Sequence, residues 1–408
     1  MKMEAFEKRA GVSQKIRTSR DKRHTLFQLD NPKCTFTLKD LAPILGFTTS
    51  KQMSDRLSTL EKKEGYTFNR ALNRNFALTA KDVWWLCEYL NIPHHTNKGR
   101  MGFVLNIMNL KGGVGKSTTT NMVADGLTLD IKLITKQLRV CIIDLDPQGS
   151  ATKQALGDFK PGDLFTSAIT LMYKEPSKIT KEQIKKVSII QTGNENLDII
   201  PCTTDDGFLA PVLAEKAAER GEKVHDLLQT HVIDHIKDEY DVILVDAGPH
   251  LDDVFISALG ASDGTLTPVP PKELDFDSTL KFTERLPEIF QDMIDVGYNL
   301  EKLQFSKAFM NMWAENPASV AGQVYNSNAK SELVKIFGRE DSLYEQLPND
   351  TAYQHCANVQ KTIFSISAST FSKELGTSKS YSNSKVQASK WLGCVWEAIE
   401  LAYDKEAA

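Results

Sequence analysis

The hydrophobic pattern changes twice along the chain. Residues 1–30 are mostly polar and charged, with helical propensity but few apolar residues that could enter a core, so we expect a helical arm that needs a partner. From Phe36 to Pro93, leucine and methionine residues recur at helical spacing. A polar stretch at 92–100 has the composition of a linker, and beyond it apolar runs alternate with helical stretches. The pattern predicts an arm over 1–30, a small domain over 31–98 and a larger domain over 99–408.

The small domain has the pattern of a helix-turn-helix. Thr48, Thr49 or Ser50 can cap its second helix, and Gly46 suits the left-handed turn before it. The following YTFNRALNRNFALT predicts two short strands around Asn73–Asn75, and AKDVWWLCEYL predicts a third helix. Two short helices joined by a glycine-containing turn, with a strand pair as a wing, are typical of winged helix-turn-helix domains. The apolar positions of the two helices are Leu38, Leu41, Leu45, Met53, Leu57 and Leu60.

The distribution of charge favours nucleic acid as the target of this domain. Residues 1–100 contain 19 of the 49 Lys and Arg but only 10 of the 53 Asp and Glu, which leaves 30 against 43 for the rest of the chain. A basic N-terminal part joined to an acidic remainder favours binding of a polyanion by the N-terminal part. A helical interaction domain with solvated basic residues would give a similar pattern, so that alternative stays open. The predicted DNA contacts are Lys51, Gln52, Asp55 and Arg56 of the second helix, and Arg70 and Arg74 of the wing.

The composition is ordinary for a globular protein, with 41% hydrophobic and 25% charged residues. The chain has no run of about 18 apolar residues that would predict a membrane span, and its first residues lack the apolar core of a signal peptide. Six scattered cysteines without C-x-x-C spacing predict reduced thiols. We therefore expect a cytoplasmic protein.

Residues 99–408 carry apolar runs of strand length with helical stretches between them. Runs that are apolar on both faces, linked by helical crossovers, are typical of a parallel sheet covered by helices on both sides. The expected fold class is therefore α/β. The expected strands are GFVLNIM (102–108), VCIIDLD (140–146), LDIIP (197–201), YDVILVD (240–246), GTLTPVP (264–270) and LQFSKAFMNM (303–312).

A glycine-rich loop, NLKGGVGKSTTTN at 109–121, lies between the first of these strands and a helix. Three glycines let backbone N–H groups converge on an anion, and the start of the helix adds its own unpaired N–H groups. Lys116 would reach the β- and γ-phosphates, and the Ser117 hydroxyl would bind Mg²⁺. The strict phosphate-loop pattern has glycine where this chain has Leu110. A chance glycine-rich turn would not explain G-K-S-T between a strand and a helix.

Two further strands end in carboxylates. CIIDLDPQGSAT ends its strand in Asp144 and Asp146, and YDVILVDAGPH ends its strand in Asp246. Because parallel strands end at one edge of the sheet, these side chains should lie beside the loop. Carboxylates there suit water positioning or contact with a metal. Either stretch alone could be an ordinary strand-end aspartate, but all three motifs in order predict a nucleotide site.

These three stretches resemble the motifs of a known family. KGGVGKST with its leading lysine, DLDPQGSAT and DVILVDAGPH are similar to the motifs of the deviant Walker A ATPases. Within them the chain looks most like the ParA-type partition ATPases, in the large variety with an N-terminal winged helix-turn-helix. The resemblance covers essentially the whole chain and implies a P-loop ATPase fold with ATP and Mg²⁺ as cofactors. The implied nucleotide-binding residues are Lys111, Gly112, Gly113, Val114, Gly115, Lys116, Ser117 and Thr118.

The resemblance also implies a role for each polar residue of the site. Lys111 would reach across a nucleotide-sandwich dimer to phosphates bound by the other subunit, whereas Lys116 would act within its own subunit. Thr118 would touch the α-phosphate, and Asp146 would orient the attacking water. The catalytic set is then Lys111, Lys116 and Asp146, and the metal set is Ser117, the switch carboxylate Asp144 and the Walker-B residue Asp246.

Partners follow from the same resemblance. An ATP-bound dimer would hold non-specific DNA, and a ParB-type centromere-binding protein would stimulate hydrolysis and release it, giving a nucleoid-associated protein. Without an arginine in the motifs, intrinsic hydrolysis should be slow. The N-terminal domain would bind an operator and repress its own operon, and the arm would help to build the dimer. Whether the assembly is a dimer or a filament, and whether the replicon is a plasmid or a chromosome, stays open. Two alternatives also remain: an ATPase that positions another cargo, and a transcriptional regulator with nucleotide as a ligand.

The C-terminal part adds two expectations. Residues 361–390 are rich in lysine, serine and threonine, which suits either a phosphate-binding surface or a flexible solvated loop. The family resemblance favours DNA. The last helical stretch has glutamates and aspartates on its polar face, so we expect core packing rather than membrane binding. The predicted DNA contacts here are Lys361, Lys373, Lys379, Lys385 and Lys390, and the predicted core positions are Trp391, Val395, Trp396 and Ile399.

Overall fold

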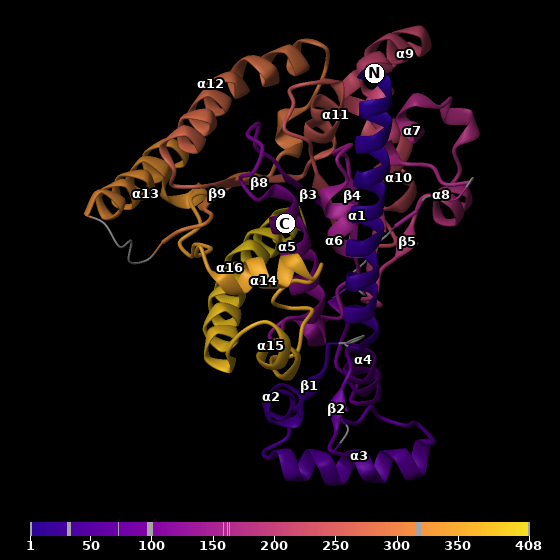
Figure 1. The fold of residues 1–408 in the computed structure, drawn as a ribbon, viewed down its shortest axis with the longest axis vertical. Coiled ribbons are helices and arrows are strands. Elements are labelled where there is room, and N and C mark those ends of the chain that lie inside the picture. The colour runs from indigo at the N-terminus through magenta and orange to yellow at the C-terminus, as the bar shows by residue number, and fades with distance from the viewer. Residues whose placement is uncertain are drawn as a thin grey trace.

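Helices surround one large sheet in the computed structural model of the protein (Figure 1). The structure describes residues 2–30, 34–71, 73–95, 101–157, 159–160, 162, 164–314 and 320–406. The predicted linker at 92–100 lies partly outside these residues. Among the described helices, none combines the length and the apolar character that a membrane span requires.

The large sheet has seven strands in the order β5-β6-β4-β7-β3-β8-β9. Six of them are parallel and are the six strands that the apolar runs predict, so the predicted α/β class is confirmed. The expectation of a purely parallel sheet is wrong at one edge, where β5 pairs antiparallel with β6. The two strands are joined by a short turn around Gly193, and a turn of this length can only reverse the chain. The strands are β3 (Phe103–Ile107), β4 (Val140–Asp144), β5 (Ile190–Gln191), β6 (Leu197–Ile200), β7 (Val242–Asp246), β8 (Gly264–Val269) and β9 (Phe305–Met310).

Alternate residues of the strands belong to two cores, one on each face of the sheet. On one face, Leu105 and Leu244 pack with helix α5 and the C-terminal helix α16. On the other, Val104 and Val245 pack with α7 and α11. In the part of the chain from residue 101 onward, the α-helices are α5 (Lys116–Leu129), α6 (Ser150–Leu156), α7 (Ala168–Tyr173), α8 (Lys181–Val187), α9 (Leu213–Arg220), α10 (Asp234–Ile236), α11 (Asp253–Ala261), α12 (Glu273–Asp295), α13 (Val320–Asp341), α14 (Thr351–Asn358), α15 (Ala368–Glu374) and α16 (Ser378–Glu406).

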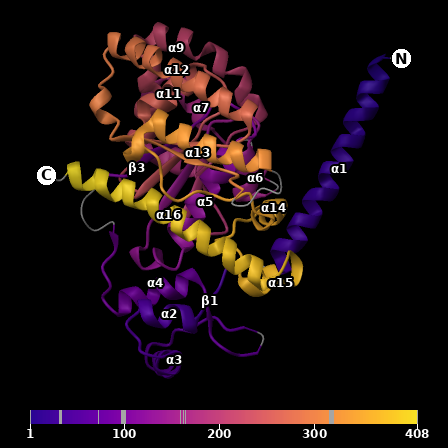
Figure 2. The ribbon, with the colours of Figure 1, turned by 90° about the vertical axis from the view of Figure 1, so that its left-hand side faces the viewer.

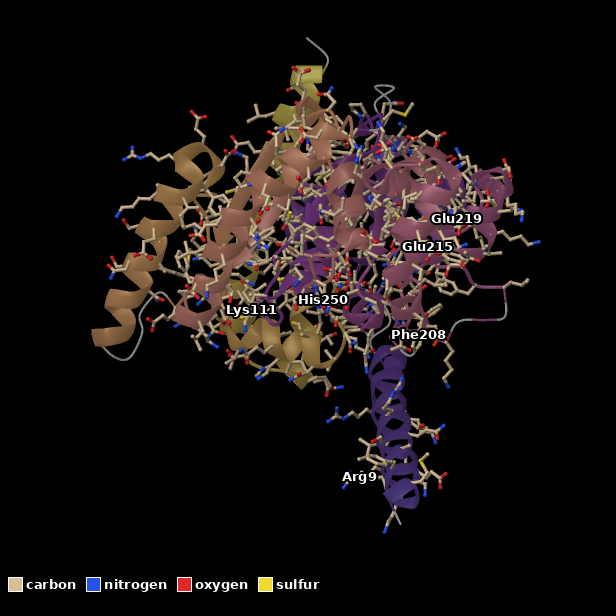
Figure 3. The ribbon with its side chains drawn as sticks, turned by 90° about the horizontal axis from the view of Figure 1, so that it is seen from above. Arg9, Lys111, Phe208, Glu215, Glu219 and His250 are labelled. Atoms are coloured by element: carbon tan, nitrogen blue, oxygen red, sulfur yellow. The ribbon has the colours of Figure 1, made fainter. Side chains whose placement is uncertain are left out.

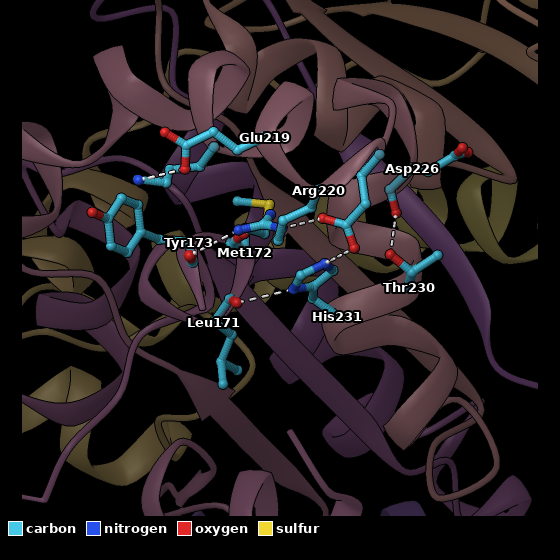
Figure 4. Close-up of polar contacts among 10 residues, drawn as sticks. Leu171, Met172, Tyr173, Glu219, Arg220, Asp226, Thr230 and His231 are labelled. Atoms are coloured by element: carbon cyan, nitrogen blue, oxygen red, sulfur yellow. Dashed lines mark hydrogen bonds and ion pairs between the residues drawn. The ribbon is translucent and has the colours of Figure 1, made fainter. Parts of the chain in front are cut away.

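The last turn of α7 is held by a cluster of polar side chains (Figure 4). Arg220 donates to the carbonyls of Met172 and Tyr173, and it pairs with Glu222 at 2.5 Å. The imidazole of His231 lies between the Leu171 carbonyl and the Glu222 carboxylate. These contacts satisfy the carbonyl groups that the end of a helix leaves unpaired, and they fix α7 against α9.

The N-terminal helices form their own packed unit at the lower end of the molecule in Figure 1. The predicted apolar positions are buried here, with Leu38 only partly so. The turn between α2 and α3 contains Gly46, and Thr49 caps α3. The predicted strand pair is shorter than expected, because β2 pairs with β1 and only one bridge, Arg70–Phe76, closes the hairpin among its described residues. The elements are β1 (Phe36–Thr37), α2 (Leu38–Ile44), α3 (Ser50–Glu64), β2 (Ala77–Leu78) and α4 (Ala80–Tyr89).

The two ends of the chain are both helical but differ in their packing. Helix α1 (Lys2–Asp30) projects away from the rest of the protein (Figure 2). Helix α16 instead crosses the body, and Trp391, Val395, Trp396 and Ile399 are buried, so the predicted core packing is confirmed. Residues 368–390 lie largely in α15 and α16. The alternative of a flexible loop is therefore wrong for that part of the segment.

Candidate nucleotide-binding site

The glycine-rich loop follows β3 directly and leads into α5, as the sequence predicts. Gly115 precedes the helix with φ of 90°, a left-handed conformation that L-residues rarely adopt. A Cβ atom at this position would lie 2.5 Å from Nδ2 of Asn311, which donates to the Val114 carbonyl at 2.7 Å. At the other end of the loop, buried Asn109 accepts from the Lys111 amide at 3.0 Å. The loop is thus fastened at both ends by asparagine side chains.

Lys116 lies under the loop. Its side chain is almost fully buried, and its ammonium group donates to the Lys111 carbonyl at 3.1 Å. Burial lowers the pKa of Lys116, while the carboxylates of Asp246 and Asp146 oppose that shift. These two aspartates are therefore near enough to favour the charged amine. An ammonium in this position can meet phosphate oxygens bound in the loop.

Asp246 has one free carboxylate oxygen. It ends β7 beside the start of α5, and its Oδ1 accepts from the Thr120 hydroxyl at 3.0 Å. Its Oδ2 is buried and has no hydrogen-bond partner among the described residues. Burial raises the pKa of Asp246, and the Ser117 and Thr120 hydroxyls and the Lys116 ammonium lower it. The predicted metal residues Ser117 and Asp246 therefore lie together.

Asp144 lies opposite Asp246 in the register of β4 and β7, but its carboxylate is already engaged. Oδ2 accepts from both the backbone N–H and the hydroxyl of Thr152, at 2.8 and 2.7 Å, and Oδ1 accepts from the Asp146 amide at 3.1 Å. Burial and the neighbouring Asp246 raise the pKa of Asp144. Asp144 thus connects the end of β4 to α6, in addition to lying next to Asp246.

Asp146 is half-buried and lies just beyond β4. Its Oδ1 accepts from the Gln148 amide at 2.9 Å, so the carboxylate is held by its own loop. The segment after β7 approaches it, because a Cβ atom on Gly248 would lie 3.9 Å from the Asp146 Cα. The three aspartates predicted from the sequence are therefore brought to one edge of the sheet.

The site fits a magnesium–nucleotide complex. Two adjacent buried carboxylates with raised pKa values gain from a cation between or beside them, and the free Oδ2 of Asp246 can accept from a water in its shell. The described residues contain no cluster of three His, Cys, Asp or Glu side chains that would form an all-protein metal cage. Mg²⁺ rarely needs such a cage, because it keeps waters and binds substrate phosphates.

Comparison with known proteins finds relatives along most of the chain. A family profile described as an AAA domain matches residues 102–296. Plasmid partition protein A of Escherichia coli is 28% identical over 361 residues, which cover 87% of this chain and 87% of that protein. A solved structure described as a partition protein covers 98% of this chain and 97% of its own, with a TM-score of 0.71 and 25% identity. The sporulation initiation inhibitor protein Soj of Bacillus subtilis is 32% identical over 169 residues, 41% of this chain and 58% of Soj.

The chain belongs to the ParA-type family of partition ATPases. The resemblance that the three motifs carry is confirmed, and the mostly parallel sheet with flanking helices is the P-loop ATPase fold of this family. The family profile ends at residue 296, so it includes the loop and all three aspartates but neither the N-terminal helices nor α13 to α16.

In this ParA-type site, Lys111 is oriented differently from Lys116. Its side chain is 41% exposed, and its ammonium group lies 3.9 Å from Asp275 at the start of α12. Figure 3 labels Lys111 in a view of the molecule from above. A lysine that leaves the loop toward solvent is free to meet another molecule, whereas Lys116 is confined to its own loop.

The predicted DNA contacts of the N-terminal unit are exposed but not all equally available. Lys51 and Arg56 are exposed on α3. The Oε1 atom of Gln52 accepts from the Thr48 amide and hydroxyl, both at 2.9 Å, so it caps the helix instead of facing outward. Arg70 pairs with Glu61 at 2.6 Å and stacks on Phe76. Arg74 is exposed at the tip of the hairpin with φ of 65°.

The predicted C-terminal lysines differ in how far their side chains are exposed to solvent. Lys373, Lys379 and Lys390 are exposed, and Lys361 is partly buried. Lys385 does not match the prediction of a surface phosphate contact, because its ammonium group donates to the Tyr381 hydroxyl at 3.2 Å and lies near the Phe364 ring. Helical spacing places residue 385 on the side of α16 that faces the body, which a count of lysines does not reveal.

Four residues that hold the site were missed in the sequence. Thr120 is four residues after Lys116 and therefore on the same side of α5. Thr152 belongs to the quoted DPQGSAT stretch, and its position after the glycine could have suggested a contact back to Asp144. Asn109 and Asn311 follow β3 and β9, so the rule that sites gather at the carboxyl ends of strands would have included them.

Proposed function

We propose that this protein is a Mg²⁺- and ATP-dependent DNA partition ATPase. ATP binding closes a dimer that holds DNA without sequence preference, and a ParB-type centromere-binding protein stimulates hydrolysis and releases the dimer. The observation that carries the proposal is the phosphate loop with the buried side chains of Lys116 and Asp246, in a chain that matches a plasmid partition protein over 87% of both lengths.

Each polar group has a place in this scheme. Lys116, the loop amides and Thr118 would hold the phosphates of ATP, while Ser117 and Asp246 would hold Mg²⁺ through its water shell. Bound Mg²⁺ supplies neutralisation of charge on the phosphates. Asp146 orients the attacking water, and Lys111 crosses to the phosphates of the other subunit. The three motifs contain no arginine, so hydrolysis without a partner is slow.

The N-terminal parts serve DNA and assembly. Residues 31–98 act as a winged helix-turn-helix that binds an operator of its own operon, with Lys51, Arg56 and Arg74 as the exposed cations. Residues 1–30 are a dimerisation arm. The arm proposal is supported by exposure: the described residues of α1 lie outside the core, and four large apolar side chains on it, Met3, Phe6, Val12 and Ile16, are at least half exposed.

The proposal is tested by retention on DNA with ATP, with ADP and without nucleotide, together with electron microscopy of the same samples. ATP alone should give strong retention, because only the closed dimer holds DNA. Lys116→Gln should lose both ATP binding and retention. DNA affinity that needs no nucleotide and survives Lys116→Gln would contradict the switch, and microscopy distinguishes a dimer from a filament.

A nucleotide-liganded transcriptional regulator is the second candidate, supported by the packed N-terminal helices. Asp146→Ala separates the two candidates. A partition ATPase with this change should still bind ATP and DNA but lose turnover and fail to segregate its replicon. Normal segregation by Asp146→Ala would contradict the proposed mechanism. If the wild type repressed its operon but had no role in segregation, the regulator would be favoured. An ATPase for another cargo would show turnover but no effect of a centromere-binding partner.

A further inference from the structure

A groove lies between α13 and the segment that follows it, away from the residues that carry the three motifs. One wall is the exposed side of α13, and the other contains Trp313, just after β9, and Ser342, Leu343, Tyr344 and Gln346. In Figure 1 this part of the molecule is at the far left, at the β9 edge of the sheet. The family profile stops before it.

The cations of the groove lack acidic partners. Lys330, Lys335 and Arg339 line it and are exposed, and none of them forms an ion pair with a described residue. Among the described residues that line the groove, none is acidic. Asp341 lies just beyond Arg339, but Lys307 is its partner at 3.5 Å. Three positive charges without a described counter-ion in one groove favour an anionic occupant.

The neutral groups of the groove suit a sugar–phosphate backbone. Ser327 and Ser331 are one helical turn apart on α13, and Lys330 and Lys335 lie beside them. On the opposite wall, the hydroxyl of Ser342 is buried and has no hydrogen-bond partner among the described residues. Hydroxyl and ammonium groups are the usual contacts of phosphate oxygens, and the Lys330 ammonium lies over the Trp313 ring, 5.8 Å from its centre, on the same groove.

Residues 311–313 connect the groove to the phosphate loop. Asn311 follows β9 and donates to the Val114 carbonyl of the loop at 2.7 Å, and Trp313 is only two residues further on. Met312 between them has φ of 56°, a strained conformation for a side chain of its size. A change in the loop on nucleotide binding therefore has a direct route to one wall of the groove.

We propose that this groove is where the protein holds the backbone of non-specific DNA, with Lys330, Lys335 and Arg339 as phosphate contacts and Asn311 as the link to the nucleotide. The proposal rests on the proposed function, which supplies the DNA. It assigns the contact to α13, whereas the sequence pattern points to the lysines of 361–390.

The test compares two pairs of lysine changes. Lys330→Gln with Lys335→Gln removes two charges from the groove. Lys178→Gln with Lys186→Gln removes two exposed lysines, near α8 at the opposite side of the molecule, that form no ion pair with a described residue. Affinity for a fluorescein-labelled random-sequence duplex is measured by anisotropy in the presence of a slowly hydrolysed ATP analogue, over a series of salt concentrations. ATP binding and thermal unfolding are measured on the same samples.

The groove pair should weaken DNA binding by about 10-fold or more at moderate salt and reduce the slope of log affinity against log salt by about 2, because each phosphate contact releases a counterion. The control pair should leave the slope unchanged. An unchanged slope for the groove pair, with normal DNA retention by the wild type, would overturn the groove but leave the proposed function standing. No ATP-dependent retention by the wild type would instead overturn the proposed function. A groove pair that keeps DNA but loses a labelled polyglutamate peptide would assign the groove to an acidic protein segment and overturn the proposal.

Discussion

The two buried aspartates of the site differ more than their sequence contexts suggest. Both end central strands and lie opposite each other, yet Asp144 accepts three hydrogen bonds and Asp246 keeps Oδ2 without a partner among the described residues. A carboxylate oxygen without a partner can accept a hydrogen bond from a water bound to a metal ion. A carboxylate with both oxygens hydrogen-bonded instead joins two segments, and a bound ligand can rearrange that connection. Thr152 makes this connection between Asp144 and α6, so a side-chain hydrogen bond ties the end of β4 to the DPQGSAT stretch.

Lys111 and Lys116 should respond differently to substitution. Lys111→Ala should weaken ATP-driven dimerisation and hydrolysis by about 10-fold or more, while ATP affinity of the monomer changes by about 2-fold at most. The reason is that a hydrogen bond between charged groups contributes about 1.5–3 kcal/mol, and in the proposed mechanism the bond of Lys111 to phosphate forms only in the dimer. The measurements are equilibrium binding of a fluorescent ATP analogue and light scattering with and without ATP.

Lys116→Gln is the control for this experiment, since it should lose nucleotide binding itself. Lys111 is 41% exposed and its ammonium group lies 3.9 Å from Asp275, so its removal should leave thermal unfolding nearly unchanged. If Lys111→Ala and Lys116→Gln lost nucleotide binding equally, the proposal that Lys111 acts on the nucleotide of the other subunit would be contradicted.

At the scale of elements, the join between β3 and α5 depends on Gly115. An alanine there would have to adopt φ near 90° and would bring its Cβ to 2.5 Å from the Asn311 amide. Gly115→Ala should therefore lower the free energy of unfolding by about 1–3 kcal/mol and weaken ATP binding. Thermal unfolding monitored by fluorescence, with and without ATP, measures both effects.

Gly112→Ala is the matched control, because a Cβ atom at residue 112 meets no atom within 4 Å. That variant should unfold at nearly the wild-type temperature without nucleotide. If the two variants unfolded alike, the contact between the loop and Asn311 would not constrain the loop, and the proposed route from the loop to the α13 groove would lose its support.

The sequence predicted the elements of the ATPase part well because buried strands and a phosphate loop are local patterns. All six predicted strands are present, and the loop lies where its glycines place it. Long-range contacts were not predictable in the same way: Asn311 reaches the loop from 197 residues away, and Lys385 is turned toward Tyr381 although a run of lysines suggests solvent. The antiparallel edge strand β5 has two residues, too few for a hydrophobic period to be visible.

At the scale of the whole molecule, the two parts that we propose to bind DNA, the N-terminal unit and the α13 groove, both adjoin the large sheet. The N-terminal helices and the sheet belong to one continuous apolar cluster. A rearrangement of side chains in the core can therefore displace the N-terminal unit. Among the described side chains of helix α1, none belongs to this cluster. Figures 2 and 3 show this helix as a rod that leaves the body, and its 29 residues span about 43 Å at the helical rise.

A rod of this length that projects from the body is expected to find packing partners in a second copy. A helix that buries no face is marginal in water, and the exposed side chains of Phe6 and Ile16 would be covered by contact with a partner. Phe6→Asp with Ile16→Asp should therefore weaken self-association by about 10-fold or more, since each apolar side chain buried in an interface contributes about 1.5–3 kcal/mol. Sedimentation at several protein concentrations, with and without ATP, measures the association.

The control for the arm is Lys8→Gln with Lys15→Gln, which changes exposed residues of the same helix without removing apolar surface. This pair should self-associate like the wild type, and both pairs should bind ATP normally because the phosphate loop is untouched. If the aspartate pair associated as tightly as the control pair in every nucleotide state, α1 would not be the dimerisation arm. The dimer would then depend on the nucleotide face alone, and Lys111→Ala should abolish it in full.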